Sequence, residues 1–502
     1  MSAAITAVGN PDGDLVYASF AAFHERFAGV FPRPEPRSHA GKYLRALMGP
    51  VERRNGWQIA EAVGDASPGA VQRLLHQAVW SADEAGDRLR EIVRETFGDP
   101  EGIGVVDETG FLKKGTESVG VGRQYTGTAG KIENCQVGVF VSYVSPKGHV
   151  LLEREIYLPK AWAADAARRE KAKVPREVRF QTKPALARRM LARTWAAGMP
   201  MRWVTGDEVY GNDPKFRDFV TAHGRRFVLA VGCKTRVWTT RPALEPVPRK
   251  RSRKSTSRRA MRVVQGAAPA LPVDAVVASW RPQAWQRVVT QFGEKGPIEH
   301  DWAAVRVVEC RSKRPGPDRW LLARRSVSNP SEIAYYLAEA PLDTPLQSLA
   351  MVASSRYTIE QCFEEAKDDV GMDHYEVRQW PSWYRHITLC MMALVWLTLA
   401  RAGLDQAMLA AFRGVTVPNR DAAPPHLSVP LDTLLGPSST AFTPPTTSAL
   451  AAPTEVHPEA TERIESAIVV DGPEAPTSQV DLVSVPSSDS GKKGGPTQTR
   501  HG

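Results

Sequence analysis

The first hundred residues have the hydrophobic pattern of helices. Between residues 14 and 98 apolar positions recur every three or four residues, which is the spacing of one helix face. Two short periodic stretches, 57–64 and 70–76, flank a polar segment with glycine and proline, which is typical of a helix-turn-helix motif. The residues that such a motif would offer to DNA are Gln72, Arg73 and His76 in the groove, and Arg53, Arg54 and Asn55 along the backbone. A helical hairpin that never touches DNA has the same pattern, so both interpretations stay open.

After residue 98 the pattern changes to short apolar runs that predict β-strands. One predicted strand, 103–106, ends at Asp107, and a later one, 201–205, ends at Gly206 and Asp207. The other predicted elements are strands at 136–143, 149–158 and 226–231, a helix over 184–197, and a helix opened by Asp213 and Pro214. Three strands, helix, strand, helix, strand is the element order of the ribonuclease-H-like fold. We therefore expect an α/β fold with such a core, although element order alone assigns no function.

Between residues 233 and 325 this order is interrupted. Short predicted strands lie at 304–309 and 320–323. A dense basic run precedes them and comprises residues 249–254, Arg258, Arg259 and Arg262. The alternative is that this run is an ordinary solvated loop, but its charge would attract phosphate whether or not the loop is ordered. We interpret the whole stretch as a basic, β-rich insertion.

Helices return after Pro345. The apolar run Ile387–Ala400 is too short to cross a bilayer and predicts a buried helix. From about residue 413 onward Pro, Ser, Thr and Ala dominate, which predicts disorder because little apolar surface is available for burial. The expected parts are a helical DNA-binding domain at 1–98, a ribonuclease-H-like core at 99–232 and 326–412, the insertion at 233–325 and a disordered tail at 413–502.

The stretch from Arg356 to Lys367 combines a predicted helix with a distinctive set of charges. It contains no Gly or Pro, and its apolar residues fall on one stripe. Arg356, Glu360 and Lys367 lie at i, i+4 and i+11, so they point within roughly 40° of one another. A carboxylate flanked by two cations suits a metal ion beside phosphate oxygens. An ordinary amphipathic helix with surface ion pairs is the alternative.

Charge and cysteine content narrow the class of partner. The formal net charge is +10 and the pI is about 9.4, which favours a polyanion such as nucleic acid. The five cysteines are odd in number and form no Cys-x-x-Cys pair, which argues against a disulfide framework and a zinc site. The N-terminus has no basic-then-apolar leader. We therefore expect a protein of the reducing cytosol with a polyanionic partner and without a membrane partner.

Three acids occupy positions that suit phosphoryl-transfer chemistry. Asp107 and Asp207 each follow a predicted strand, and Glu360 lies on a later helix. Hard divalent cations prefer oxygen ligands, and Mg²⁺ needs only two or three carboxylates because it keeps several waters. Two such ions activate a water or a 3′-hydroxyl and stabilise the leaving oxygen. Neighbouring strand residues point to opposite faces, so Glu108 and Glu208 are not expected to share the site.

Several segments resemble the bacterial insertion-sequence transposases of the DDE class. Residues 106–111 with 113–115 and 122–125 resemble the first-aspartate region, and residues 205–211 resemble the second-aspartate strand. Arg356, Glu360 and Lys367 resemble the family's Tyr-Arg-Glu-Lys signature, but Ala353 stands where the signature has tyrosine. The β-rich insertion between the second and third acids is also typical of these enzymes. The likeness covers roughly residues 15–403.

The resemblance implies roles for particular side chains. Asp107, Asp207 and Glu360 would be catalytic and would ligate two Mg²⁺ ions, with Mn²⁺ able to substitute. The side chains that would hold DNA phosphates are Arg356, Lys367, Lys113, Lys114 and Arg123; for the last three a solvated surface charge is the alternative. Trp380 and Trp383 would either stack on an extruded base or belong to the core.

The implied function is a DNA transposase that cleaves and joins the ends of an insertion sequence. Its partner would be double-stranded DNA, namely terminal inverted repeats and target DNA, and the complex would contain a homodimer. Two alternatives stay open: a DNA-binding regulator that no longer cuts, and a general Mg²⁺-dependent nuclease.

Overall fold

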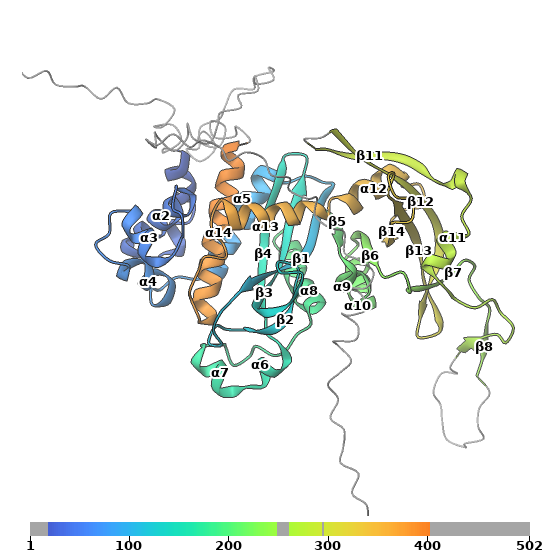
Figure 1. Cartoon of the computed structure of the whole chain (residues 1–502), viewed down its shortest axis with the longest axis horizontal. Helices are drawn as coiled ribbons and strands as arrows, with labels where there is room; N and C mark the ends of the chain where they lie inside the picture. The colour runs from blue at the N-terminus through green and yellow to red at the C-terminus, as the bar shows by residue number, and fades with distance from the viewer. Residues whose placement is uncertain (1–18, 248–260, 294–295, 402–502) are drawn as a thin grey trace, which may run out of the picture. The chain divides into compact units, whose positions relative to one another are not determined.

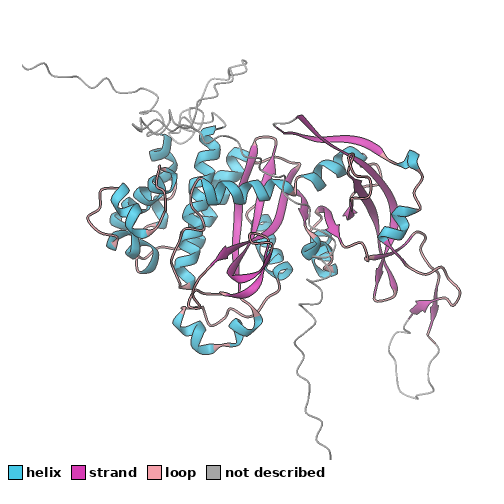
Figure 2. Ribbon diagram, in the orientation of Figure 1, coloured by secondary structure: helices cyan, strands magenta, loops and turns pink. Residues whose placement is uncertain are grey.

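A computed structural model describes residues 19–247, 261–293 and 296–401 of the 502-residue chain (Figure 1). The tail expected at 413–502 lies outside these residues, as does the basic run except for Arg262, which pairs with Glu245. The fold is mixed α/β (Figure 2).

Five strands form the centre of a large mixed sheet, in the order β4-β3-β1-β5-β6. Their bounds are β1 Gly102–Leu112, β3 Lys131–Ser145, β4 Gly148–Tyr157, β5 Met201–Gly206 and β6 Arg226–Val231. β3 is antiparallel to both β1 and β4, whereas β1, β5 and β6 are parallel neighbours. The short strand β2, Gly122–Thr126, also pairs with β3. All five predicted strands of the chain before residue 232 are confirmed, and β1 is longer than predicted.

The sheet continues without a break into the strands after β6. β14 pairs antiparallel with β6, and β13, β12 and β7 follow in order. The bounds are β7 Arg236–Trp238, β10 Leu271–Pro272, β11 Gln286–Gly293, β12 Gly296–Arg311, β13 Arg314–Arg325 and β14 Ile333–Glu339; β8 Leu244–Pro246 and β9 Met261–Val263 form a separate pair. The β12–β13 turn places Ser312 and Lys313 at positive φ, as a tight hairpin requires. This turn allows strands longer than the predicted 304–309 and 320–323.

Helices flank the sheet and precede it (Figure 1). The α-helices are α2 Pro34–Met48, α3 Gly56–Ala62, α4 Gly69–His76, α5 Ala82–Phe97, α6 Lys160–Ala164, α7 Ala166–Lys171, α8 Lys183–Ala196, α9 Glu208–Gly211, α10 Pro214–Ala222, α11 Val273–Ala278, α12 Leu346–Ser354, α13 Tyr357–Asp368 and α14 Trp380–Arg401; two 3₁₀ helices span Ala28–Val30 and Pro282–Ala284. α8 packs on β3 and β4, whereas α13 packs on β1, β3 and β4.

Helix α14 joins the N-terminal helices to the sheet. It contacts β4, α2, α4 and α5, and most of its side chains are buried. In the described part of the chain it is the one helix long and apolar enough to cross a membrane, and 83% of its apolar window is buried in the protein. The predicted buried helix at Ile387–Ala400 is therefore confirmed.

The two helices of the expected helix-turn-helix are present as α3 and α4, but half of the expected DNA contacts have structural roles. The side chain of Asn55 accepts hydrogen bonds from the backbone of Trp57 and Gln58 and so caps α3. Arg54 donates to the carbonyls of Leu47, Asp368 and Asp369, and His76 is hydrogen-bonded to Ser382. Gln72, Arg73 and Arg53 remain exposed.

A buried charge network fixes α5 and α8 against β4. Glu153, which is fully buried, pairs with Arg90 of α5 and with Arg193 of α8 at 2.8 Å. Glu155 accepts from Arg193 at 2.7 Å and from the hydroxyl of Tyr384 at 2.7 Å. Each buried carboxylate is thus matched by guanidinium donors, which offsets the cost of removing the charges from water. The network holds α8 in place, and the first turn of α8 carries Lys183.

His386 supplies a test of the packing between α14 and α2. Its Nδ1 lies 2.9 Å from the Tyr43 hydroxyl and its Nε2 lies 3.1 Å from the Met372 carbonyl, so a neutral ring satisfies both partners. Burial lowers the pKa of His386 from its ordinary value of 6.5 to about 3. The unfolded chain therefore takes up the proton first, and the folded state loses stability as the pH falls below 6.5.

We expect wild-type protein to lose about 2 kcal/mol more unfolding free energy between pH 7 and pH 5 than His386→Gln does. Urea unfolding at both pH values measures the difference. His223→Gln, at an exposed position, serves as the control and should follow the wild type. Equal pH dependence in wild type and His386→Gln would contradict the buried neutral ring.

Candidate functional site

The parallel register of β1 and β5 places two aspartates side by side. The last paired residues are Val106 and Gly206, and Asp107 and Asp207 come directly after them. Gly206 suits this position because a Cβ there would lie only 3.0 Å from the Val106 carbonyl oxygen. The prediction that the first strand ends at Asp107 is wrong, since β1 continues to Leu112 through its pairing with β3. Only the partner strand β5 ends there.

The two carboxylates repel each other in a largely buried setting. Burial raises the pKa of Asp107 well above its usual range, and the charges of Asp207 and Glu108 raise it further. Burial, followed by the Glu108 charge, raises the pKa of Asp207 to about 7. Backbone amides offset part of this, since Asp107 accepts from the Glu108 amide at 2.8 Å and Asp207 from the Val209 amide at 2.9 Å. The second of these bonds also caps α9.

Arg356 lies between the aspartates and Glu360. Its Nη1 is 2.9 Å from Glu360 Oε1 and 3.9 Å from Asp107 Oδ2. The side chain of Glu360 is 48% exposed, and its carboxylate forms an ion pair with Arg356. Within residues 19–247, 261–293 and 296–401 no three His, Cys, Asp or Glu side chains form a group that could hold a metal ion. The structure thus places the two aspartates next to each other, whereas Glu360 contacts Arg356, which in turn lies 3.9 Å from Asp107.

The donor set nevertheless fits a hard divalent cation. Burial raises the pKa of both carboxylates, and the charge of Asp207 raises the pKa of Asp107 further, so a bound cation would stabilise their ionised forms. Both offer oxygen ligands of the kind that Mg²⁺ and Mn²⁺ prefer. Asp107 and Asp207 could therefore hold a metal, with Glu360 as the nearest further carboxylate on α13.

A second charged group lies on the other face of β1. Glu108 Oε1 is 2.6 Å from Lys183 Nζ, and its Oε2 accepts from the Tyr210 hydroxyl at 2.6 Å. Strand alternation is kept, because Glu108 bonds to residues of α8 and α9 while Asp107 lies near Arg356 at the start of α13. The charge of Glu108 still raises the pKa of both aspartates. Glu108 thus influences the site from the opposite face.

Sequence reasoning missed Lys183 and Tyr210. The predicted helix began at Pro184, whereas Thr182 caps α8 and Lys183 is its first residue. The local pattern gave no signal for Lys183, because its partner Glu108 is 75 residues away in the chain. The hydroxyl of Tyr210, fully buried among these acids, also had no signal in the sequence.

The other expected phosphate contacts are spread over the surface and the core. Lys113 packs over the Tyr375 ring and donates to the Tyr375 carbonyl at 3.0 Å, and burial lowers the pKa of Lys113 to about 8. Lys367 Nζ bonds to the Thr128 hydroxyl at 3.2 Å, far along α13 from Arg356. Lys114 and Arg123 are exposed. Of these four side chains, the last two are the most accessible.

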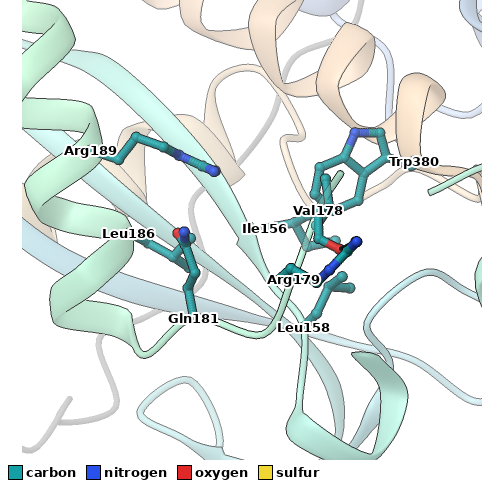
Figure 3. A pocket seen from close by; sticks show the side chains of 8 residues that line it. All are labelled: Ile156, Leu158, Val178, Arg179, Gln181, Leu186, Arg189 and Trp380. Atoms are coloured by element: carbon teal, nitrogen blue, oxygen red, sulfur yellow. Dashed lines mark hydrogen bonds between the residues drawn. The ribbon is translucent and has the colours of Figure 1, made fainter. Parts of the chain in front are cut away.

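The two tryptophans before α14's apolar run differ in accessibility. Trp383 is fully buried and donates its indole N–H to the Tyr375 hydroxyl, so it belongs to the core. Trp380 packs against Tyr384 with the two rings tilted by 45°, and it lines a small hollow with Gln181 and Arg189 (Figure 3). The hollow has a volume of about 10 Å³, which holds at most one water. No base fits into this hollow as it stands.

Two comparisons with known proteins found similar sequences. The family model of the DDE superfamily endonucleases matches residues 26–297, a stretch that contains Asp107 and Asp207 and ends before Glu360. The probable transposase for insertion sequence element IS701 of Microchaete diplosiphon is 28% identical over 184 residues. This match covers 36% of the chain and 46% of the relative, so the chain matches about half of that protein's length. The family model matches more than half of the residues of this chain. The chain therefore belongs to the DDE superfamily of endonucleases.

Proposed function

We propose that this protein is a DNA transposase that cleaves DNA at the ends of an insertion sequence and joins those ends to target DNA. The observation that carries the proposal is the pairing of Asp107 and Asp207 beyond the last register pair of β1 and β5. The strand order β4-β3-β1-β5-β6, with β3 antiparallel and the last three strands parallel, supports a ribonuclease-H-like core. The likeness to a probable transposase gives the substrate class.

In this proposal Asp107 and Asp207 hold the divalent ions, and Glu360 is the third carboxylate. Bound Mg²⁺ or Mn²⁺ would supply an activated water or 3′-hydroxyl and stabilise the leaving oxygen. Arg356 pairs with Glu360 in the structure, with its Nη1 2.9 Å from Glu360 Oε1. A DNA phosphate offers the guanidinium a competing bidentate partner, which would release Glu360 toward the aspartates.

Basic side chains around the site would hold the DNA backbone. Lys114 and Arg123 are exposed, and Lys113 and Lys367 need to leave their present partners to reach a phosphate. The exposed Arg53, Gln72 and Arg73 would provide contacts from the N-terminal helices. Two subunits would pair the two DNA ends. We also propose the domain limits expected from the sequence: a DNA-binding domain at 1–98, a catalytic core at 99–232 and 326–412, an insertion at 233–325 and a tail at 413–502.

Replacement of either aspartate tests the assigned catalyst. Asp107→Asn and Asp207→Asn keep the side-chain shape but lose the metal-binding charge. We expect each to reduce Mg²⁺-dependent cleavage of duplex DNA made from the sequence flanking the gene by about 10³-fold or more, the scale on which an essential catalytic group acts. Asp343→Asn, an exposed acid in the loop between β14 and α12, is the matched control and should cut normally. Full cleavage by Asp107→Asn would exclude the site.

The alternatives predict other results in the same assay. A regulator that no longer cuts would bind the flanking DNA without nicking it under any divalent ion. A general nuclease would cut without joining the ends to target DNA. Detection of joined products therefore separates transposition from both.

Metal binding is measurable without DNA. Removing repulsion between two buried carboxylates should stabilise the metal-free protein, so Asp107→Asn should melt about 1 °C above wild type in EDTA, the shift that about 1 kcal/mol of relief gives in a chain of this size. Millimolar Mg²⁺ should raise the melting temperature of wild type and leave that of Asp107→Asn unchanged, because bound cation stabilises only the folded state. Thermal denaturation with and without Mg²⁺ measures both effects. An equal Mg²⁺ response in the two proteins would exclude Asp107 as a ligand.

The pair of Lys183 and Glu108 forms a positioning element whose coupling a double-mutant cycle measures. Lys183→Met leaves Glu108 unpaired beside two aspartates and should cost about 3 kcal/mol, the scale of a broken buried ion pair. Glu108→Gln in the same chain removes the orphaned charge and should restore most of the loss. Urea unfolding of the two single variants and the double variant gives the coupling energy. Additive losses would mean that the pair is not coupled.

A further inference from the structure

The guanidinium of Arg324, on β13, is poorly matched by acids. Its Nη1 donates to the Tyr357 hydroxyl at 2.8 Å. Among the described residues no carboxylate lies within ion-pair distance of it. A half-buried cation that has lost much of its water without gaining a carboxylate retains a strong demand for an anion.

A second cation stands beside it. The Cζ atoms of Arg324 and Arg356 lie 5.5 Å and 4.5 Å from the centroid of the Tyr357 ring. Although burial raises the pKa of Tyr357, the two guanidinium groups outweigh it and lower that pKa. Tyr357 itself is 36% exposed, so the place where the two cations meet is open to solvent.

The remaining groups around Arg324 do not neutralise it. Tyr336 is buried and hydroxyl-bearing, and Arg356 adds a like charge. His300, on β12, has its pKa lowered to about 4 by burial and by Arg324, so its ring is neutral, and its Nδ1 is buried without a hydrogen-bond partner in the described part of the chain. Arg356 shares its charge between Glu360 and Asp107. Arg324 is therefore the cation beside Tyr357 that no carboxylate of the described residues pairs with.

We propose that Arg324 and Arg356 together bind one DNA phosphate beside the acidic site, with Tyr357 as the positioning residue that holds Arg324. This inference rests on the proposed function and deepens it. A phosphodiester suits the site because it presents two oxygens to planar guanidinium groups, which bind such oxygens in pairs. The β-rich insertion then has a role in DNA binding, because β13 carries a cation from the insertion to the site formed by β1 and β5.

The next residue along β13 shows what an ordinary arginine looks like here. Arg325 bonds to Asp301 at 3.0 Å and lies over the Trp285 ring at 4.3 Å. Successive strand residues point to opposite faces, so Arg325 faces away from Tyr357. Arg325 has the same charge as Arg324 and is its neighbour in the sequence, but it is already paired with Asp301. Arg325→Gln is therefore the matched control for Arg324→Gln.

The experiment measures binding of the full-length protein to a fluorescent 30-base-pair duplex of random sequence, in EDTA, over a series of salt concentrations. The slope of log K against log salt is negative, and loss of one phosphate contact reduces its magnitude by about 1. We expect Arg324→Gln to make the slope shallower by about 1 and to weaken binding about 5- to 10-fold at 0.1 M salt. Arg325→Gln should keep the wild-type slope. Tyr357→Phe keeps both charges, so it should keep the slope and weaken binding only about 2-fold.

Stability and cleavage complete the design. If Arg324→Gln melts much lower than wild type and keeps the wild-type slope, Arg324 is structural and the proposal is overturned. If Arg324→Gln does not fold, Arg324→Lys decides: an unchanged slope with affinity reduced about 3-fold supports a phosphate contact, and wild-type affinity overturns it. Equal losses in Arg324→Gln and Arg325→Gln also overturn it. Wild-type protein that shows the expected slopes and never cuts flanking DNA with Mg²⁺ would remove the proposed function while supporting the phosphate site.

Discussion

Repulsion between the carboxylates of Asp107 and Asp207 is the constraint around which the site is organised. The parallel register of β1 and β5 forces them together, because each follows the same residue pair on neighbouring strands. Two buried like charges destabilise a fold unless cations stand nearby. The chain supplies them from both faces of β1: Arg356 beside Asp107 and Lys183 on Glu108. The charge network on β4 in turn fixes α8, whose first residue is Lys183.

The sequence predicted the local elements well because each depends on near neighbours. The apolar runs before Asp107 and Asp207 and the helical stripe of α13 follow from spacing alone, and the structure has strands and a helix there. The length of β1 was not predictable, since its continuation past Asp107 depends on pairing with β3 some thirty residues away in the chain. The expected strand before Asp207 is present as β5, and its register places Asp207 beside Asp107.

Contacts between residues far apart in the chain determine which polar side chains are available for binding, and the sequence pattern does not reveal these contacts. Arg54 has the charge of a DNA contact, but the carbonyls of Asp368 and Asp369 at the end of α13 use its donors. The side chain of His76 is likewise hydrogen-bonded, to the hydroxyl of Ser382. Arg324 was hidden because a single arginine in a strand has no pattern, and only the fold brings it to Tyr357. Burial and pairing, rather than residue type, separated available side chains from occupied ones.

The junction between β6 and β14 has a mechanical consequence. Five consecutive residue pairs, from Tyr335 opposite Val231 to Glu339 opposite Phe227, link the two strands through backbone hydrogen bonds. A hinge that opened this seam would have to break those bonds, so the pairing holds β13 and its neighbours in the same sheet as the strands that carry the acids. Under the proposed function, DNA that reached both Arg324 and the two aspartates would have to bend to fit the sheet, and the nucleic acid would bear the energy of that bending.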